Sequence, residues 1–339
     1  MASRARQRRA VCFGNSMQRG YSRAPRGPEE HTDGSIMKAG KYLRSKGVRW
    51  TTRLFLTVLF VYFVNRSLSG REITVILESL RGIHVVGALL LGVGGLWCQA
   101  KRWEIILRYE RFPVTSSTAW KTLLMGNLFA FVTPGRLGEL FRGVGIEEGR
   151  KADAVFAVIV DKLFIVATVL LVGLATVFWQ AAVRGVAPPF RPVAPVGATI
   201  AVCLLAAPLI VRGPKRVYAK PVIRYAARLV RMTPRAFSPA GRLALGCSLG
   251  AHLLLLCQTV LLLMMFGVSN AVDALLAAGQ AYALMAIVPL FIGNMGIREY
   301  AYGLFLSRLG VSPAGAMDVK VAAFGASAAV LTVNLIVPA

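Results

Sequence analysis

The chain has 339 residues, of which 56% are hydrophobic and only 16% are charged, and its formal net charge is +25. Soluble domains contain about 45–50% apolar and about 25% charged residues, so this composition excludes an ordinary globular protein, and it also excludes a disordered chain, collagen and a coiled coil. Apolar runs long enough to cross a bilayer instead predict an all-α polytopic membrane protein.

Residues 1–48 are predicted to form a basic, disordered cytoplasmic tail. From Met1 to Arg53 there are thirteen Lys and Arg residues against three acids, and residues 1–36 have no periodic apolar face. Basic residues beside membrane spans are normally retained in the cytoplasm, which is a stronger interpretation here than nucleic-acid binding. Met37 is an alternative start of translation, because it leads directly into the first span.

The first membrane half is predicted at 49–180. Full spans are expected around 54–64, 83–100 and 153–179. The apolar stretch 118–132 is shorter than the about 20 residues that a span needs, and Pro134 and Gly135 follow it directly. Because Pro and Gly interrupt helices, residues 118–146 are predicted to form a re-entrant hairpin.

A Pro-rich outer linker at 181–193 leads to the second membrane half at 194–339. Further spans are expected around 194–211, 243–266 and 314–337. The stretch 272–309 is apolar but broken by Pro289 and Gly293, which predicts a second re-entrant hairpin.

Positive charge predicts the orientation. The segment 212–236 carries eight Lys and Arg residues and no acid, so we expect it to lie at the cytoplasmic membrane interface. With a cytoplasmic N-terminus, three spans and a hairpin then place the linker outside, and the C-terminus returns to the cytoplasm. The two halves run in opposite directions, which predicts an inverted repeat of about six full spans plus two re-entrant hairpins.

The two hairpin tips carry the residues that point to a binding site. A helix that restarts after a break presents its positive end to an anion such as phosphate, and guanidinium groups match phosphate oxygens. The predicted breaks are Pro134, Gly135, Gly138, Pro289, Gly293 and Gly296. The predicted substrate-binding residues beside them are Arg136, Glu139, Arg142, Asn294, Arg298 and Glu299. An ordinary salt bridge, for example between Arg136 and Glu139, is an equally weighted alternative.

Asp161, Lys162 and Lys320 complete the predicted substrate-binding set. With a helix start near residue 153, Asp161 lies about 12 Å into its span, close to the middle of the bilayer. Ionisable groups at that depth are costly and mark functional sites. Adjacent residues point about 100° apart, so Asp161 and Lys162 should contact different partners. A helix start displaced by one turn would instead bring both to the interface.

No metal or cofactor site is predicted. The three histidines lie far apart, without metal-binding spacing, and the five cysteines show no CxxC pairing. The polar residues Asn127, Gln258 and Gln280 lie in apolar surroundings, and we expect them to form interhelical hydrogen bonds.

From about Arg49 to its C-terminus the sequence resembles the flippase-like family, the membrane region of lysylphosphatidylglycerol synthases and their free-standing relatives. The resemblance rests on the order and spacing of Lys101-Arg102-Trp103, the Thr-Pro-Gly-Arg-x-Gly-Glu-x-x-Arg run from Thr133 to Arg142, Asp161-Lys162-Leu163, Gly293-Asn294-x-Gly296-Ile297-Arg298-Glu299 and Gly310-Val311-Ser312. Asn294 and Lys162 stand where we would expect Gly and Arg.

This resemblance implies a lipid flippase that moves a polar-headed lipid across a bacterial or archaeal cytoplasmic membrane, or a protein that helps to assemble such a lipid. The expected partners are membrane lipids with anionic phospholipid or glycolipid head groups, and no nucleic acid. Relatives fused to a soluble aminoacyl-transfer domain also synthesise the lipid, an activity not expected of this chain, which ends just after its last predicted span. The alternatives are a polytopic transferase acting on a lipid-linked substrate and a non-transporting partner of a cell-envelope lipid pathway.

Overall fold

The computed structural model describes Gly70, Thr74, Ile76, residues 78–80, 82–132 and 137–143, Ile146, residues 150–185, 238–287 and 297–311, Pro313 and residues 318–336. The chain divides into two units, residues 1–64 and 65–339, and every described residue belongs to the second. The predicted tail at 1–48, the predicted spans at 54–64 and 194–211 and the basic segment 212–236 lie outside the described residues, as does most of the linker.

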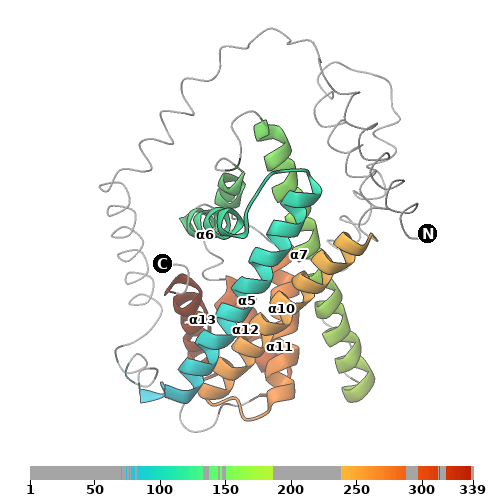
Figure 1. Ribbon diagram of the computed structural model, residues 1–339. Coiled ribbons are helices and arrows are strands. Elements are labelled where there is room, and N and C mark those ends of the chain that lie inside the picture. Colours follow the sequence, from blue (N-terminus) through green and yellow to red (C-terminus); the bar gives the residue numbers. More distant parts are fainter. Residues whose placement is uncertain are drawn as a thin grey trace, which may run out of the picture. The chain divides into compact units, whose positions relative to one another are not determined.

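The described residues form helices and contain no strand (Figure 1). In chain order the helices are α5 (Gly82–Tyr109), α6 (Ser116–Val132), the short 3₁₀ helix η1 (Leu137–Arg142), α7 (Lys151–Arg184), α10 (Pro239–Met265), α11 (Ala271–Ile287), α12 (Ile297–Arg308) and α13 (Val319–Ile336). The predicted all-α fold is therefore confirmed for this part of the chain.

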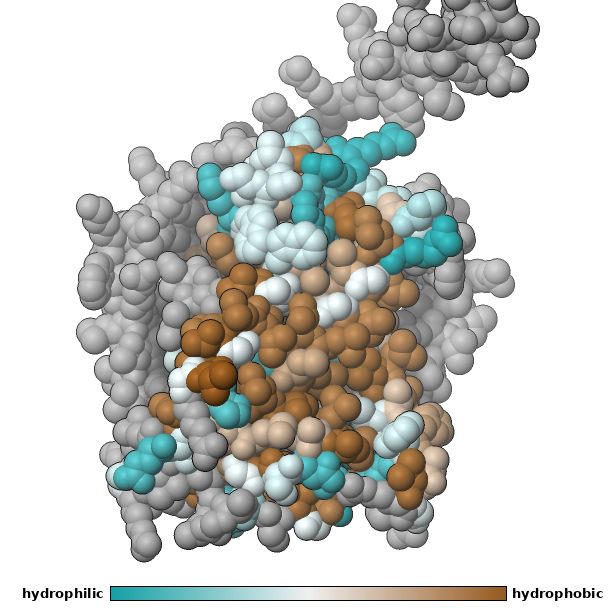
Figure 2. Space-filling model, turned by 60° about the horizontal axis from the view of Figure 1, so that its bottom comes forward, coloured by the Kyte–Doolittle hydropathy of each residue, from teal (hydrophilic) through white to brown (hydrophobic). Residues whose placement is uncertain are grey.

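Three of these helices, α5, α7 and α10, are long and apolar enough to cross a membrane, while α11 and α13 are shorter apolar helices. On the face drawn in Figure 2, hydrophobic side chains fill the middle, and hydrophilic side chains gather toward the upper and lower edges. Large apolar side chains such as Leu90, Leu171 and Phe178 are exposed on the outside of these helices. Such a surface is unfavourable in water and suits a hydrocarbon environment, so the protein is a membrane protein.

Helices α5 and α10 pack along each other in opposite directions (Figure 1). Near the start of α5, Gln258 of α10 donates a hydrogen bond to the Ala88 carbonyl at 3.0 Å. Toward the end of α5, the partner on α10 is Ser248, ten residues earlier in the sequence. Gln280 of α11 likewise donates to Gln180 of α7 at 2.5 Å. The glutamines therefore form the interhelical hydrogen bonds predicted from their apolar surroundings.

Helix α5 extends nine residues beyond the predicted end of its span at Ala100. Arg102 and Trp103 therefore lie inside the helix and are buried, although a basic and aromatic pair after an apolar run is typical of a membrane interface. The indole of Trp103 donates a hydrogen bond to Thr122 of α6 at 3.0 Å. Burial of these two residues is possible because neighbouring helices supply their polar partners, which the local sequence does not reveal.

The segment predicted as the first hairpin consists of α6 and η1, with residues 133–136 between them outside the described residues. Gly138 lets η1 lie directly on α6, because a Cβ atom at this position would lie 2.2 Å from the carbonyl carbon and oxygen of Phe129. The 3₁₀ helix η1 ends at Arg142, four residues before the predicted end of the hairpin at residue 146.

Small residues also set the distance between α7 and α11. A Cβ atom on Gly173 of α7 would lie 2.4 Å from the Cβ of Ala283, and one on Gly279 of α11 would lie 2.6 Å from the Thr176 methyl group. Small residues let membrane helices approach closely and gain van der Waals contact. The second predicted hairpin starts at α11 and continues as α12, which packs on both α11 and α13.

Candidate functional site

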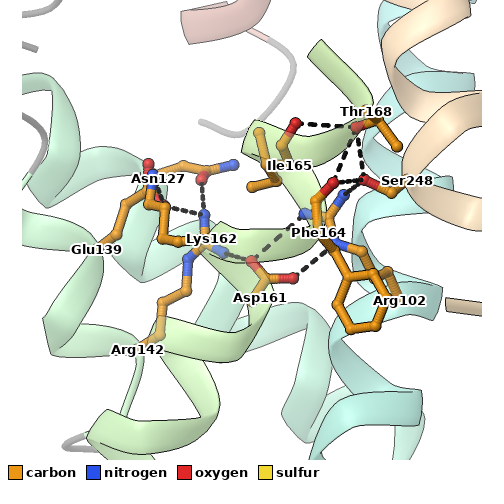
Figure 3. Close-up of polar contacts among 10 residues, drawn as sticks. All are labelled: Arg102, Asn127, Glu139, Arg142, Asp161, Lys162, Phe164, Ile165, Thr168 and Ser248. Atoms are coloured by element: carbon orange, nitrogen blue, oxygen red, sulfur yellow. Dashed lines mark hydrogen bonds and ion pairs between the residues drawn. The ribbon is translucent and has the colours of Figure 1, made fainter. Parts of the chain in front are cut away.

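Asp161 of α7 is the centre of a buried cluster of charged side chains (Figure 3). Its carboxylate is fully buried and accepts two hydrogen bonds from Arg102 of α5, at 2.6 Å from Nε to Oδ1 and 3.3 Å from Nη2 to Oδ2. Nη1 of Arg142, at the end of η1, donates to Oδ2 at 2.9 Å. One carboxylate therefore joins two guanidinium groups from different elements. Such charge-assisted hydrogen bonds are stronger than those between neutral groups.

Arg142 connects this centre to a second carboxylate. Its Nη2 donates to Oδ1 of Asn127 on α6 at 2.6 Å and lies 3.2 Å from Oε2 of Glu139. The same Glu139 oxygen lies 2.5 Å from Nζ of Lys162. Asp161 and Lys162 thus contact different partners, as their spacing on one helix predicts.

Arg102 extends the cluster to α10. Its Nη1 donates to Ser248 Oγ at 3.3 Å, and Ser248 in turn donates to the Phe164 carbonyl of α7 at 3.0 Å (Figure 3). Thr168 Oγ1 lies 3.0 Å from the same serine oxygen. These contacts fix the guanidinium plane of Arg102, so its bidentate geometry toward Asp161 is preorganised.

Among the described residues, the cluster contains more cations than carboxylates. Its three cations, Arg102, Arg142 and Lys162, face two carboxylates, those of Glu139 and Asp161, all within direct ion-pair distance. The side chains of both arginines and both acids are at most 2% exposed, whereas that of Lys162 is 34% exposed. Lys162 is therefore the edge of the cluster that is accessible from outside the bundle.

Arg142 retains an unused donor, because its buried Nε has no hydrogen-bond partner. The side chain reaches the cluster by lying across Gly126 of α6, where a Cβ atom would come within 2.0 Å of the arginine Cγ. Buried donors are normally satisfied, and an exception in a native structure calls for an explanation such as a ligand. An unused donor on a buried guanidinium is an arrangement suited to an oxyanion.

Of the predicted substrate-binding residues, Glu139, Arg142, Asp161 and Lys162 meet in the cluster. Glu299 of α12 instead accepts a hydrogen bond from Ser327 of α13 at 2.6 Å, and Arg298 also lies on α12. Lys320, expected to lie as deep in its helix as Lys162, is exposed in the first turn of α13, because that helix starts only at Val319. Arg136, Asn294 and five of the six predicted breaks, Pro134, Gly135, Pro289, Gly293 and Gly296, lie outside the described residues.

Three members of the cluster were not predicted as site residues, namely Arg102, Asn127 and Ser248. Asn127 was expected only to form an interhelical hydrogen bond, which it does with Arg142. Arg102 follows an apolar run and precedes a tryptophan, a pattern typical of an interface anchor. A signal that could have identified it is the buried carboxylate at Asp161, which requires a cationic partner from another helix.

Comparison with known proteins identifies the membrane region of which this cluster is part. The family model described as "Lysylphosphatidylglycerol synthase TM region" matches residues 50–333. The chain belongs to this family. The match covers α5 to α12 in full and all but the last three residues of α13, and membership indicates a function related to membrane lipids. No curated protein and no solved structure matches the chain significantly.

Proposed function

We propose that the protein is a lipid flippase, which moves a lipid with a polar, phosphate-bearing head group between the two leaflets of the membrane. Membership of the lysylphosphatidylglycerol synthase membrane-region family supports a role in lipid biology. A charged head group cannot enter hydrocarbon without a large free-energy cost, so a protein that moves it must replace its water with polar groups. The cluster around Asp161 supplies such groups inside the helical bundle.

The observation that carries this proposal is the unused Nε donor of the buried Arg142 guanidinium. The neighbouring Lys162 is partly exposed. A head-group phosphate that approached from the Lys162 side would meet Lys162 first and Arg142 next, while Asp161 and Glu139 keep the guanidinium groups in place. The acyl chains would remain in the lipid throughout.

An inverted repeat would give such a site access from both leaflets. A shift of 158 residues moves the start of α5 to residue 240, beside Pro239 where α10 begins, and the start of α6 to residue 274, close to Ala271 where α11 begins. Neighbour relations recur as well: α5 packs on α6 as α10 packs on α11, and α6 packs on η1 as α11 packs on α12. These correspondences support re-entrant hairpins in two oppositely directed halves.

Lipid exchange in liposomes tests the function. Purified full-length protein is reconstituted with a fluorescent phosphatidylglycerol analogue, and the fraction of probe that dithionite bleaches reports exchange between leaflets. We expect the wild-type protein to accelerate exchange and Arg142→Gln to slow it at least tenfold. Arg108→Gln is the matched control, because the Arg108 side chain on α5 is 61% exposed and makes no contact with the cluster around Asp161 among the described residues.

Two outcomes contradict the proposal. Equal exchange in Arg142→Gln and in Arg108→Gln would show that the cluster does not serve the head group. No exchange of any lipid class, together with chemical turnover of a lipid-linked substrate, would indicate a transferase instead. Correct folding of each variant is checked by its elution as a single peak in size-exclusion chromatography.

A further inference from the structure

A second set of polar side chains lies inside the bundle, away from the cluster around Asp161. His252 and Thr259 lie on α10, Tyr282 on α11 and Tyr302 on α12. The rings of His252 and Tyr282 meet edge to face at 5.7 Å between centroids, and those of Tyr282 and Tyr302 meet in the same way at 6.1 Å. All four side chains are buried. They bring hydroxyl groups from three helices together.

The hydroxyl groups of this set are unequally satisfied. Thr259 donates to the Leu255 carbonyl at 2.9 Å, so at 2.8 Å the Tyr282 hydroxyl must be the donor to Thr259. The Tyr302 hydroxyl lies near both groups, yet it makes no hydrogen bond of acceptable geometry, and Tyr302 is fully buried. Its O–H donor is therefore available to a further acceptor.

Arg298 provides a second available donor one helical turn from Tyr302. Residues four apart lie on the same face of a helix, so the two side chains are neighbours on α12. The Nε of Arg298 is buried without a hydrogen-bond partner, and no ion pair joins Arg298 to a carboxylate among the described residues. The carboxylate of Glu299 accepts its hydrogen bond from Ser327 on α13 instead.

Arg298 lies in the first turn of α12, and Tyr302 lies one turn further along the helix. The first backbone N–H groups of a helix have no intrahelical acceptor, and the helix dipole favours negative charge at this end. A guanidinium without a carboxylate partner among the described residues, a buried phenol O–H and a helix N-terminus together offer hydrogen-bond donors and positive potential. The ligand chemistry that fits is an oxyanion.

We propose that Arg298 and Tyr302 form a second anion-binding site, which takes a phosphate group. The phosphate of a lipid head group and a free phosphate ion offer the same chemistry. If the ligand is a lipid, the inference rests on the proposed flippase function. The site then binds the lipid head group in the second half of the protein. Arg142 and Arg298 would then play corresponding roles, since each follows a predicted helix break and each holds a buried, unused Nε donor.

Phosphate binding by the full-length protein in nanodiscs tests the site. Isothermal titration with inorganic phosphate compares the wild-type protein with Tyr302→Phe, which removes one O–H group and keeps the ring, and with Arg298→Gln. Tyr300→Phe is the matched control, because Tyr300 lies on the same helix and is 66% exposed. We expect the affinity to fall at least tenfold in the first two variants and to stay unchanged in the control.

A second arm distinguishes the sources of the phosphate. Native mass spectrometry measures retention of phosphatidic acid against diacylglycerol, which differs from it by the phosphate. Loss of selectivity for phosphatidic acid in Tyr302→Phe identifies a lipid phosphate, whereas an effect on inorganic phosphate alone identifies the free ion.

Wild-type protein that binds neither probe, or variants that bind both as tightly as the wild type, would overturn the second site, even if lipid exchange still depended on Arg142. Conversely, phosphate binding that depends on Tyr302 in a protein without lipid exchange would overturn the flippase function and keep the site.

Discussion

Asp161 compensates two buried guanidinium groups at once, and its removal should therefore cost more stability than the loss of an ordinary ion pair. Asp161→Asn preserves the size of the side chain but leaves Arg102 without a carboxylate partner among the described residues and leaves Arg142 with Glu139 alone. Breaking a buried pair in this way costs about 3–5 kcal/mol. We expect a loss of this order in the free energy of unfolding, measured by denaturant titration in detergent micelles.

Arg108→Ala is the control for this measurement, because the Arg108 side chain is 61% exposed and its partner Glu104 keeps a second ion pair with Lys101. Exposed pairs contribute about 0–1 kcal/mol. A similar loss of stability in Asp161→Asn and Arg108→Ala would mean that water reaches Asp161 and that the cluster is not a dry, preorganised site.

Gly138 is the residue on which the position of Arg142 depends. Gly138→Ala would place a methyl group 2.2 Å from the Phe129 carbonyl, so η1 must move away from α6 and carry Arg142 out of contact with Asp161. We expect a lower melting temperature in detergent and loss of lipid exchange in liposomes. Gly246→Ala on α10 is the control, because a Cβ atom there meets nothing within 4 Å. It should leave both readouts unchanged, or raise stability by about 0.5–1 kcal/mol through helix propensity.

Single residues differ in how well the sequence predicts their roles. Asp161 and Lys162 stand out because ionisable groups in an apolar run are costly wherever the helix lies. Arg102 does not stand out, because its partner lies 59 residues away in the sequence and the local pattern resembles an interface anchor. Lys320 lies as many residues after Gly293 as Lys162 lies after Gly135, yet a later helix start leaves Lys320 exposed.

At the scale of elements, unbroken apolar runs predict helices well. Helices α7 and α10 begin and end within a few residues of the predicted spans, because hydrophobic length alone determines whether a helix can cross the bilayer. The length of the 3₁₀ helix η1, which follows α6, is predicted less well. Its length depends on the contact of Gly138 with the α6 backbone, which is a tertiary interaction.

The contact between α7 and α11 yields a prediction at this scale. Gly173→Ile would insert a branched side chain where even a Cβ atom lies 2.4 Å from Ala283, so the two helices must separate. We expect a lower melting temperature and weaker protection of α11 against hydrogen exchange. Leu171→Ile, at a position that is 62% exposed, is the control and should have little effect. Equal protection of α11 in both variants would contradict close packing as the cause of helix association here.

At the scale of the whole molecule, the arrangement of positive charge predicts on which side of the membrane each loop lies. Between Arg242 and Arg298 the chain has no Lys or Arg, and this stretch includes the loop from α10 to α11. The loop from α5 to α6, in contrast, is surrounded by Lys101, Arg108, Arg111 and Lys121. The positive-inside rule therefore assigns the loop between α5 and α6 to the cytoplasm and the loop between α10 and α11 to the outside. In an inverted repeat these two loops correspond, so they must lie on opposite sides.

Two Ser→Cys variants test this arrangement in a cysteine-free background. Ser117, at the start of α6, and Ser269, between α10 and α11, are both exposed, and each substitution changes a single atom of the side chain. A membrane-impermeant maleimide applied to intact cells should label Ser269→Cys, and it should label Ser117→Cys only after the membrane is permeabilised. Labelling of both variants from the same side would contradict the inverted repeat. The α5–α6 pair and the α10–α11 pair would then have the same orientation in the membrane, whereas an inverted repeat requires opposite orientations. Without the inverted repeat, the alternating access on which the flippase proposal depends would have no structural basis.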